Sequence, residues 1–98
     1  MTTLLHCKTL KSSNVADQCR EFGLVVGDTI EGRQEYEFRG KKCWNEVRLT
    51  LIWIGQIAAA WMHSERNNHT RVNWSEPVET VAWDLSDRIW RKLEKEAR

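Results

Sequence analysis

The side chains that could hold a metal ion or act as a nucleophile are three cysteines and three histidines. They are His6, Cys7, Cys19, Cys43, His63 and His69. None of them repeats at the spacing of a zinc site, and no two cysteines are separated by only two residues. Cys19 falls on the apolar side of a predicted helix, where a thiol behaves as a small hydrophobic group. We therefore expect no metal site, no cofactor and no catalytic cysteine.

No other spacing typical of an enzyme occurs in the chain. It lacks the serine nucleophile motif, the phosphate-binding loop and the dinucleotide fingerprint. The acidic residues are spread out, and Glu35 with Glu37 is most simply a solvated pair. The sequence therefore predicts a protein that is not an enzyme and has no catalytic residues.

The composition is that of one ordinary globular domain covering residues 1–98. Of the 98 residues, 41% are hydrophobic and 30% are charged. The net charge of +1 disfavours a dedicated nucleic-acid binder, which usually carries a clear basic excess. Three cysteines, an odd number, indicate reduced thiols, and residues 1–8 do not read as a signal peptide. The longest apolar stretch, 49–62, is too short for a bilayer span of about 20 residues. We expect a cytoplasmic protein that does not enter a membrane.

Capping signals bound one short helix at residues 12–23. Ser12, Ser13 and Asn14 are N-cap residues, and Gly23 suits the left-handed conformation after the last turn. We expect residues 1–11 before the helix and 94–98 at the other end to be flexible.

The strands are expected in the remaining 24–93. Residues 24–32 indicate a turn and a short strand, and 33–45 a long loop or an irregular hairpin. Alternation over 46–66 predicts a hairpin with a two-residue turn at Gly55-Gln56. In that register Leu51 lies opposite Ala60 on the inner face, and a slip of one residue would exchange the two faces.

The last part of the chain completes the expected fold. Alternation predicts a strand at 79–85, and 89–93 reads as a strand or a helical turn. One short N-terminal helix followed by four or five short strands favours an α+β, mostly β class. The best fit is a small antiparallel, SH3-like, partly open barrel, since an OB-like barrel needs longer strands.

Six tryptophans are unusual for 98 residues, and they divide into two groups. We assign Trp53, Trp83 and Trp90 to the core. The candidates for exposure are Trp44, Trp61 and Trp74.

The outer face of the hairpin and the loop after it form the candidate protein-binding face. Its residues are Arg48, Thr50, Trp61, His63, Arg66, Arg71 and Trp74. Tryptophan and arginine are enriched at the energetic centres of protein interfaces, so a protein partner is the first interpretation. Aromatic side chains beside basic ones also suit single-stranded nucleic acid, which is the second. A third, a barrel that holds a small molecule, has little room for a pocket. Exposed tryptophans and open strand edges also fit a homodimer.

Four segments resemble small accessory proteins of enterobacterial tailed phages and prophages. They are VGDTIEG at 26–32, WNEVRLTLIWIG at 44–55, WSEP at 74–77 and WDLS at 83–86. The resemblance covers most of the chain up to Leu93 and carries no site residues with it. It implies a phage protein made in the bacterial cytoplasm that binds a host protein and inhibits or modulates it, for example in counter-defence.

Overall fold

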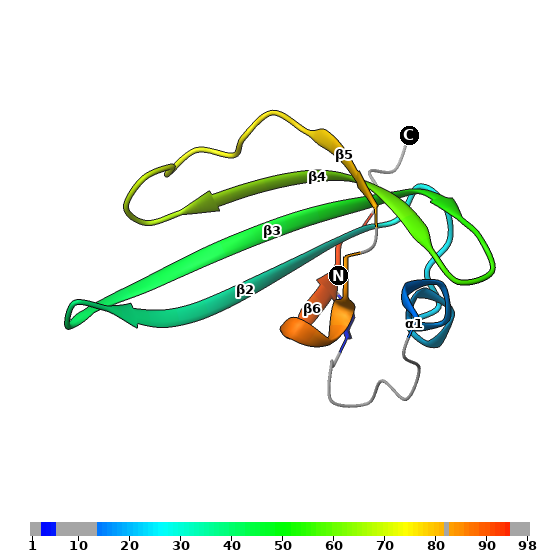
Figure 1. The fold of residues 1–98 in the computed structure, drawn as a ribbon, viewed down its shortest axis with the longest axis horizontal. Helices are drawn as coiled ribbons and strands as arrows, with labels where there is room; N and C mark the ends of the chain where they lie inside the picture. Colours follow the sequence, from blue (N-terminus) through cyan, green and yellow to red (C-terminus); the bar gives the residue numbers. More distant parts are fainter. Residues whose placement is uncertain (1–2, 6–13, 82, 95–98) are drawn as a thin grey trace.

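The computed structural model describes residues 3–5, 14–81 and 83–94, which form one helix and a six-stranded antiparallel sheet in the order β1-β6-β2-β3-β4-β5. The elements in chain order are β1 (Thr3–Leu5), α1 (Val15–Glu21), β2 (Thr29–Phe38), β3 (Lys41–Ile54), β4 (Ala59–Asn67), β5 (Val78–Val81), the 3-10 turn η2 (Leu85–Asp87) and β6 (Trp90–Lys92). Figure 1 shows α1 and η2 on the same side of the sheet, with β2 and β3 reaching far beyond them.

The mostly β class and the five strands after the helix are confirmed, but the expected barrel is wrong. β1 and β5 are the two edges of the described sheet and belong to its opposite ends, so the sheet is open. Closure is absent because β1 pairs with β6 and lies far from β5 in the strand order. Within the segment 1–11 that we expect to be flexible, Thr3–Leu5 form strand β1. Residues 1–2, 6–13 and 95–98 lie outside the described residues.

The predicted helix is confirmed with its caps. The Asn14 side chain accepts a hydrogen bond from the Asp17 N–H at 2.8 Å, as an N-cap should. Gly23 has φ +69°, and the Leu24 N–H reaches back to the Cys19 carbonyl at 2.9 Å. These two features make the C-terminal motif in which glycine ends a helix.

Residues 33–45 form a regular hairpin, not a loop. The register of β2 with β3 is continuous from Thr29 opposite Thr50 to Phe38 opposite Lys41. The chain turns at Arg39 and Gly40, with φ of +52° and +76°, the conformation that a two-residue hairpin turn requires. We call residues 33–44 the arm, because they project from the body of the molecule (Figure 1).

The register of β3 with β4 is one residue away from the predicted one. Leu51 lies opposite Trp61, and a bulge follows between Leu51 and Trp53. The connection occupies residues 55–58, longer than the two-residue turn expected at Gly55-Gln56. Because side chains alternate along a strand, the shift moves every residue of β4 to the other face. The bulge in turn moves Trp53 off the face of Leu51.

The end of the chain resolves the remaining expectations. The strand predicted at 79–85 is shorter, because Asp84 accepts a hydrogen bond from the Ser86 N–H and starts the η2 turn. Of the two structures expected for 89–93, a strand or a helical turn, the structure shows a strand, β6, which lies between β1 and β2.

The core lies on the face of the sheet that α1 and η2 cover. We call it the core face; its buried residues are Ile30, Val47, Leu49, Leu51, Ala59, Trp61 and Trp90. The other face we call the open face; it carries Glu31, Glu46, Arg48, Thr50, Trp53, Met62, Ser64 and Arg66. Trp90 is buried as predicted and Trp83 packs partly against the core, but the core assignment of Trp53 is wrong.

Candidate protein-binding face

Arg48 is held at the centre of the open face by a buried carboxylate. Its Nε and Nη2 donate to Glu31 Oε2 at 3.2 and 2.9 Å, and Arg91 donates to Glu31 Oε1 at 2.8 Å. The Glu31 side chain is only 7% exposed, so it needs these partners. Burial by itself raises the pKa of Glu31, but the hydrogen bonds and charges of Arg91 and Arg48 outweigh it and hold the pKa below its ordinary value.

A second buried carboxylate holds Arg66 in the same way. Arg66 Nε donates to Glu46 Oε1 at 2.7 Å, and the Glu46 side chain is 6% exposed. Glu46 lies directly opposite Arg66 across β3 and β4, which is the pairing that brings opposite charges together on one face of a sheet.

Trp74 lies against both guanidinium groups. Its ring centre is 4.1 Å from the Arg48 guanidinium carbon and 4.7 Å from that of Arg66. At these distances a guanidinium group is attracted to the electron-rich face of an indole ring.

The chain beside β4 fixes the position of Trp74. Ser75 donates its N–H to the Glu65 carbonyl, its hydroxyl accepts from the Glu65 N–H, and both bonds are 2.9 Å long. Ser64 donates its hydroxyl to the Ser75 carbonyl. The connection between β4 and β5 is therefore attached to the edge of β4, one residue from the indole.

The open face continues in two directions from this centre. Toward the arm, the Arg33 guanidinium lies 4.5 Å from the Trp44 ring centre. Toward the other end, Trp53 shares its row with Ala60 and Val81. The Trp53 side chain is the most exposed indole described, at 54%. The face thus carries arginines and tryptophans over most of its length.

The structure brings four of the seven predicted site residues together and separates the rest. Arg48, Thr50, Arg66 and Trp74 belong to the open face. Arg71 is exposed in the connection after β4, outside this cluster.

Trp61 and His63 lie on the core face, which corrects their assignment to the binding face. Trp61 is fully buried, because the shifted register places it opposite Leu51. His63 packs against Trp83 with a ring separation of 4.9 Å, and its Nε2 is 3.4 Å from a Glu65 oxygen. Neither of these two rings can be the centre of a docking surface.

Sequence reasoning missed the partners of the arginines and the exposed indole. The missed residues are Glu31, Arg33, Trp44, Glu46, Trp53 and Arg91. The signal for Arg33, Trp44 and Glu46 was the alternation of 33–46, which is weak because both faces of the arm are polar or exposed. The bulge that exposes Trp53 leaves no sign in the sequence.

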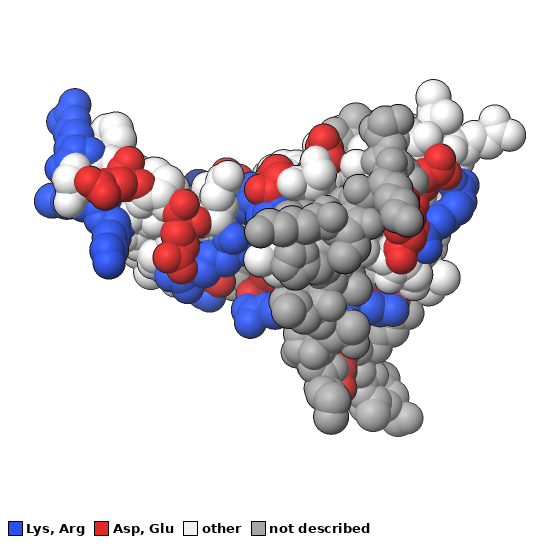
Figure 2. Space-filling view, turned by 90° about the horizontal axis from the view of Figure 1, so that it is seen from below, with Lys and Arg blue, Asp and Glu red and all other residues white. Residues whose placement is uncertain are grey.

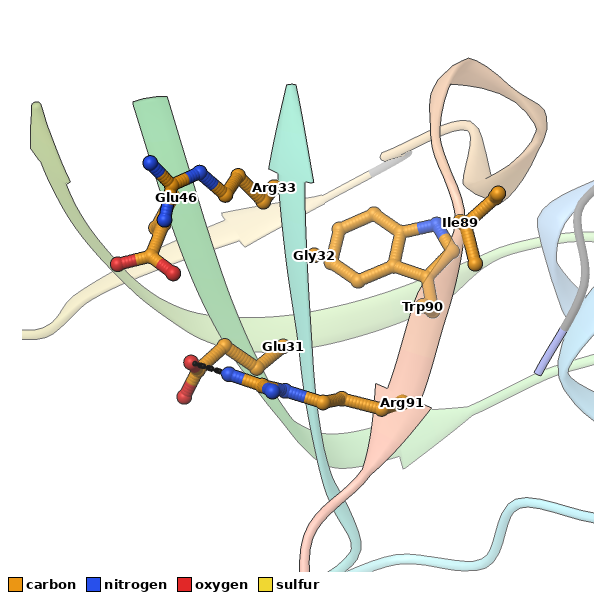
Figure 3. A pocket seen from close by; sticks show the side chains of 7 residues that line it. All are labelled: Glu31, Gly32, Arg33, Glu46, Ile89, Trp90 and Arg91. Carbon is orange, nitrogen blue, oxygen red and sulfur yellow. Dashed lines mark hydrogen bonds and ion pairs between the residues drawn. The ribbon is translucent and has the colours of Figure 1, made fainter. Parts of the chain in front are cut away.

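A pocket of about 270 Å³ opens where the arm leaves the body (Figure 3). Its lining is Glu31, Gly32, Arg33, Glu46, Ile89, Trp90 and Arg91. Both carboxylates in it are ion-paired with arginines, Glu31 with Arg48 and Glu46 with Arg66. In the part of the chain that the structure describes, no three His, Cys, Asp or Glu residues are placed to hold a metal ion.

Two further observations bear on the class of the protein. Over the described ranges, the helices are too short and too polar to cross a bilayer. No family model, no curated protein and no solved structure matches the chain.

Proposed function

We propose that this chain is a non-enzymatic protein-binding module that covers a surface of its partner with the open face. The observation that carries the proposal is the position of Trp74 against Arg48 and Arg66, with each arginine also held by a buried carboxylate. Tryptophan and arginine dominate the binding energy of protein interfaces. Side chains that are already ordered lose less entropy on binding.

The resemblance to phage and prophage accessory proteins makes a host protein in the bacterial cytoplasm the proposed partner. Binding by occlusion then modulates or inhibits that protein, as a counter-defence factor would. The proposed contact surface is the part of the open face that extends from Trp53 to Trp74. This replaces the face built around Trp61 and His63.

Nucleic acid is the weaker candidate for the same face. Glu31 and Glu46 neutralise much of the arginine charge that a phosphate backbone would need. The guanidinium groups also lie over the indole rings on which bases would stack.

A pull-down of the tagged protein from enterobacterial lysate, with and without nuclease, tests the proposal. We expect one stoichiometric host protein that survives nuclease treatment and moderate salt. Trp74→Ala and Trp53→Ala should each weaken its binding about 30-fold, the effect of losing an interface hot spot. Val78→Ala, which removes an apolar side chain that is 56% exposed on the core-face side of β5, serves as the control.

Two results would contradict the proposal. Equal capture by wild type and by both tryptophan variants would remove the open face as the binding surface. Loss of all captured protein on nuclease digestion, with binding that falls steeply as salt is added, would favour the nucleic-acid interpretation.

A further inference from the structure

One long strand edge of the arm has no neighbour. One edge of β2 pairs with β3 along the whole length of β2. The other edge of β2 is covered by β6 only from Ile30 to Gly32. Within the described residues, the edge from Arg33 to Phe38 is therefore open. It is longer than either terminal strand of the sheet, β1 or β5.

The direction of the backbone groups on this edge follows from one hydrogen bond. Leu93 donates its N–H to the Thr29 carbonyl at 2.8 Å, on the β6 side of β2. In an antiparallel strand the direction alternates with each residue. The N–H and C=O groups that point out of the open edge therefore belong to Arg33, Glu35 and Glu37.

The segment lacks three of the devices that protect an exposed strand edge from pairing. It contains no proline and no lysine, and its register with β3 has no bulge. Natural proteins use such devices to keep exposed edges from joining another strand. Tyr36 and Phe38, which are 38% and 53% exposed, lie on one side of it beside the His69 ring.

We propose that this edge pairs with the same edge of a second copy of the chain, making an antiparallel dimer about a two-fold axis perpendicular to the sheet. The dimer is independent of the proposed function, because the edge and the open face are different surfaces. Figure 2 shows acidic and basic side chains side by side on the arm, and their order along the edge selects the register.

Three registers are compared, in which Glu35, Tyr36 or Glu37 lies on the two-fold axis and faces its own copy. Two of them are unfavourable. A register centred on Glu35 would place the second copy's Phe38 opposite Gly32, where Trp90 of β6 already lies. A register centred on Tyr36 would set Glu35 against the second copy's Glu37, two like charges directly opposite each other.

The register centred on Glu37 avoids the overlap with β6 and has one like-charged pair on the axis, against two in the register centred on Tyr36. It pairs residues 36–38 of the two copies and sets Tyr36 opposite the second copy's Phe38. Glu35 then comes to the second copy's turn, where Arg39 follows the end of β2, and symmetry repeats each contact. Opposite charges and aromatic pairs are the cross-strand contacts that stabilise antiparallel strands. The Glu37 pair on the axis is the single like-charged contact.

Sedimentation velocity over a series of protein concentrations tests the dimer, with charge exchange as the probe of its register. We expect a reversible monomer–dimer equilibrium in the wild type. Glu35→Lys alone and Arg39→Asp alone should each weaken it about tenfold or more, because each creates two like-charged contacts. Aspartate is chosen for Arg39 because it tolerates the positive φ there.

The double variant Glu35→Lys/Arg39→Asp restores opposite charges and should recover the dimer to within a few-fold of wild type. Glu65→Lys, on the exposed part of β4, makes the same charge change elsewhere and should have no effect. Circular dichroism confirms that each variant is folded. A wild type that stays monomeric at every concentration, or a double variant no better than the singles, would overturn the proposal. Trp74→Ala should dimerise normally, which separates this result from failure of partner binding.

Discussion

The Arg48 guanidinium carbon lies 4.1 Å from the centre of the Trp74 ring while the same group donates two hydrogen bonds to Glu31. Arg48 is thus held from two sides, by a carboxylate within the sheet and by an indole from the following connection. An arginine fixed in this way presents a defined surface before any partner arrives. Several measurements on the isolated protein test this arrangement and the fold that produces it.

Replacing Glu31 with glutamine should destabilise the protein. The variant keeps the shape of the side chain but leaves Arg48 and Arg91 without a counter-charge. Since both guanidinium groups are partly exposed, water compensates in part, and we expect a loss of about 1–2 kcal/mol rather than the full cost of a broken buried pair. Urea denaturation measures the difference. Glu35→Gln, on an exposed side chain, is the matched control and should change stability little.

The same carboxylate should make stability depend on pH. The pKa of Glu31 in the folded protein lies below its ordinary value of 4.5, so the unfolded chain binds the proton more readily. The stabilisation is fully present above that ordinary value and is lost as the pH falls through the lowered folded value. Urea midpoints from neutral pH down to about pH 3 should therefore show wild type and Glu31→Gln converging. A constant difference between them across the range would argue against an ionised, paired Glu31.

The sequence assigns Trp53 to the core and makes Trp61 a candidate for exposure, so it predicts the larger loss of stability for Trp53→Ala. The structure predicts the reverse. Trp61 is fully buried, so Trp61→Ala should cost about 3–5 kcal/mol. Trp53 is 54% exposed, and Trp53→Ala should cost about 1 kcal/mol or less. Thermal unfolding followed by far-ultraviolet circular dichroism compares the two. The reverse order would restore the predicted register of β3 with β4.

Glycine substitutions should separate close packing from backbone strain. A Cβ at Gly32 would lie 2.6 Å from Arg88 Cδ and 2.8 Å from Trp90 Cε3, so Gly32→Ala must push β6 away. We expect about 1–3 kcal/mol of destabilisation from this overpacking, with added loss of the β6 pairing. Gly40 has open space around it and φ +76°, so Gly40→Ala costs only the strain of about 1–2 kcal/mol. Hydrogen exchange at β6 should rise in the first variant and stay unchanged in the second.

Cys19 should resist alkylation until the protein unfolds. Burial raises the pKa of its thiol to about 11, with the Arg20 charge opposing this in part. Because the thiolate is the reactive form, iodoacetamide should modify Cys19 at least about 100-fold more slowly in the native protein than in urea. Peptide mass spectrometry resolves Cys19 from the other cysteines. Rapid labelling under native conditions would show that α1 is not packed as described.

Local signals in the sequence were sufficient wherever one short segment decides its own structure. Asn14 and Gly23 bound the helix because a cap needs only neighbouring amides and a residue that accepts positive φ. The alternation of 46–54 predicts a strand because one side of it is strongly apolar. The arm was the exception, since polar residues on both faces leave little contrast for alternation to show.

The tertiary structure alone decided which residues each face presents. The positions of Trp53 and Trp61 depend on a bulge and on a one-residue shift of β4. Because successive side chains of a strand point to opposite faces, either change moves a side chain from one face to the other. The ion pairs of Glu31 and Glu46 likewise join residues on different strands, so no pattern within one segment of the sequence predicts them. The residue types that a binding face requires can be read from the sequence, but the pairing of strands determines which of them meet.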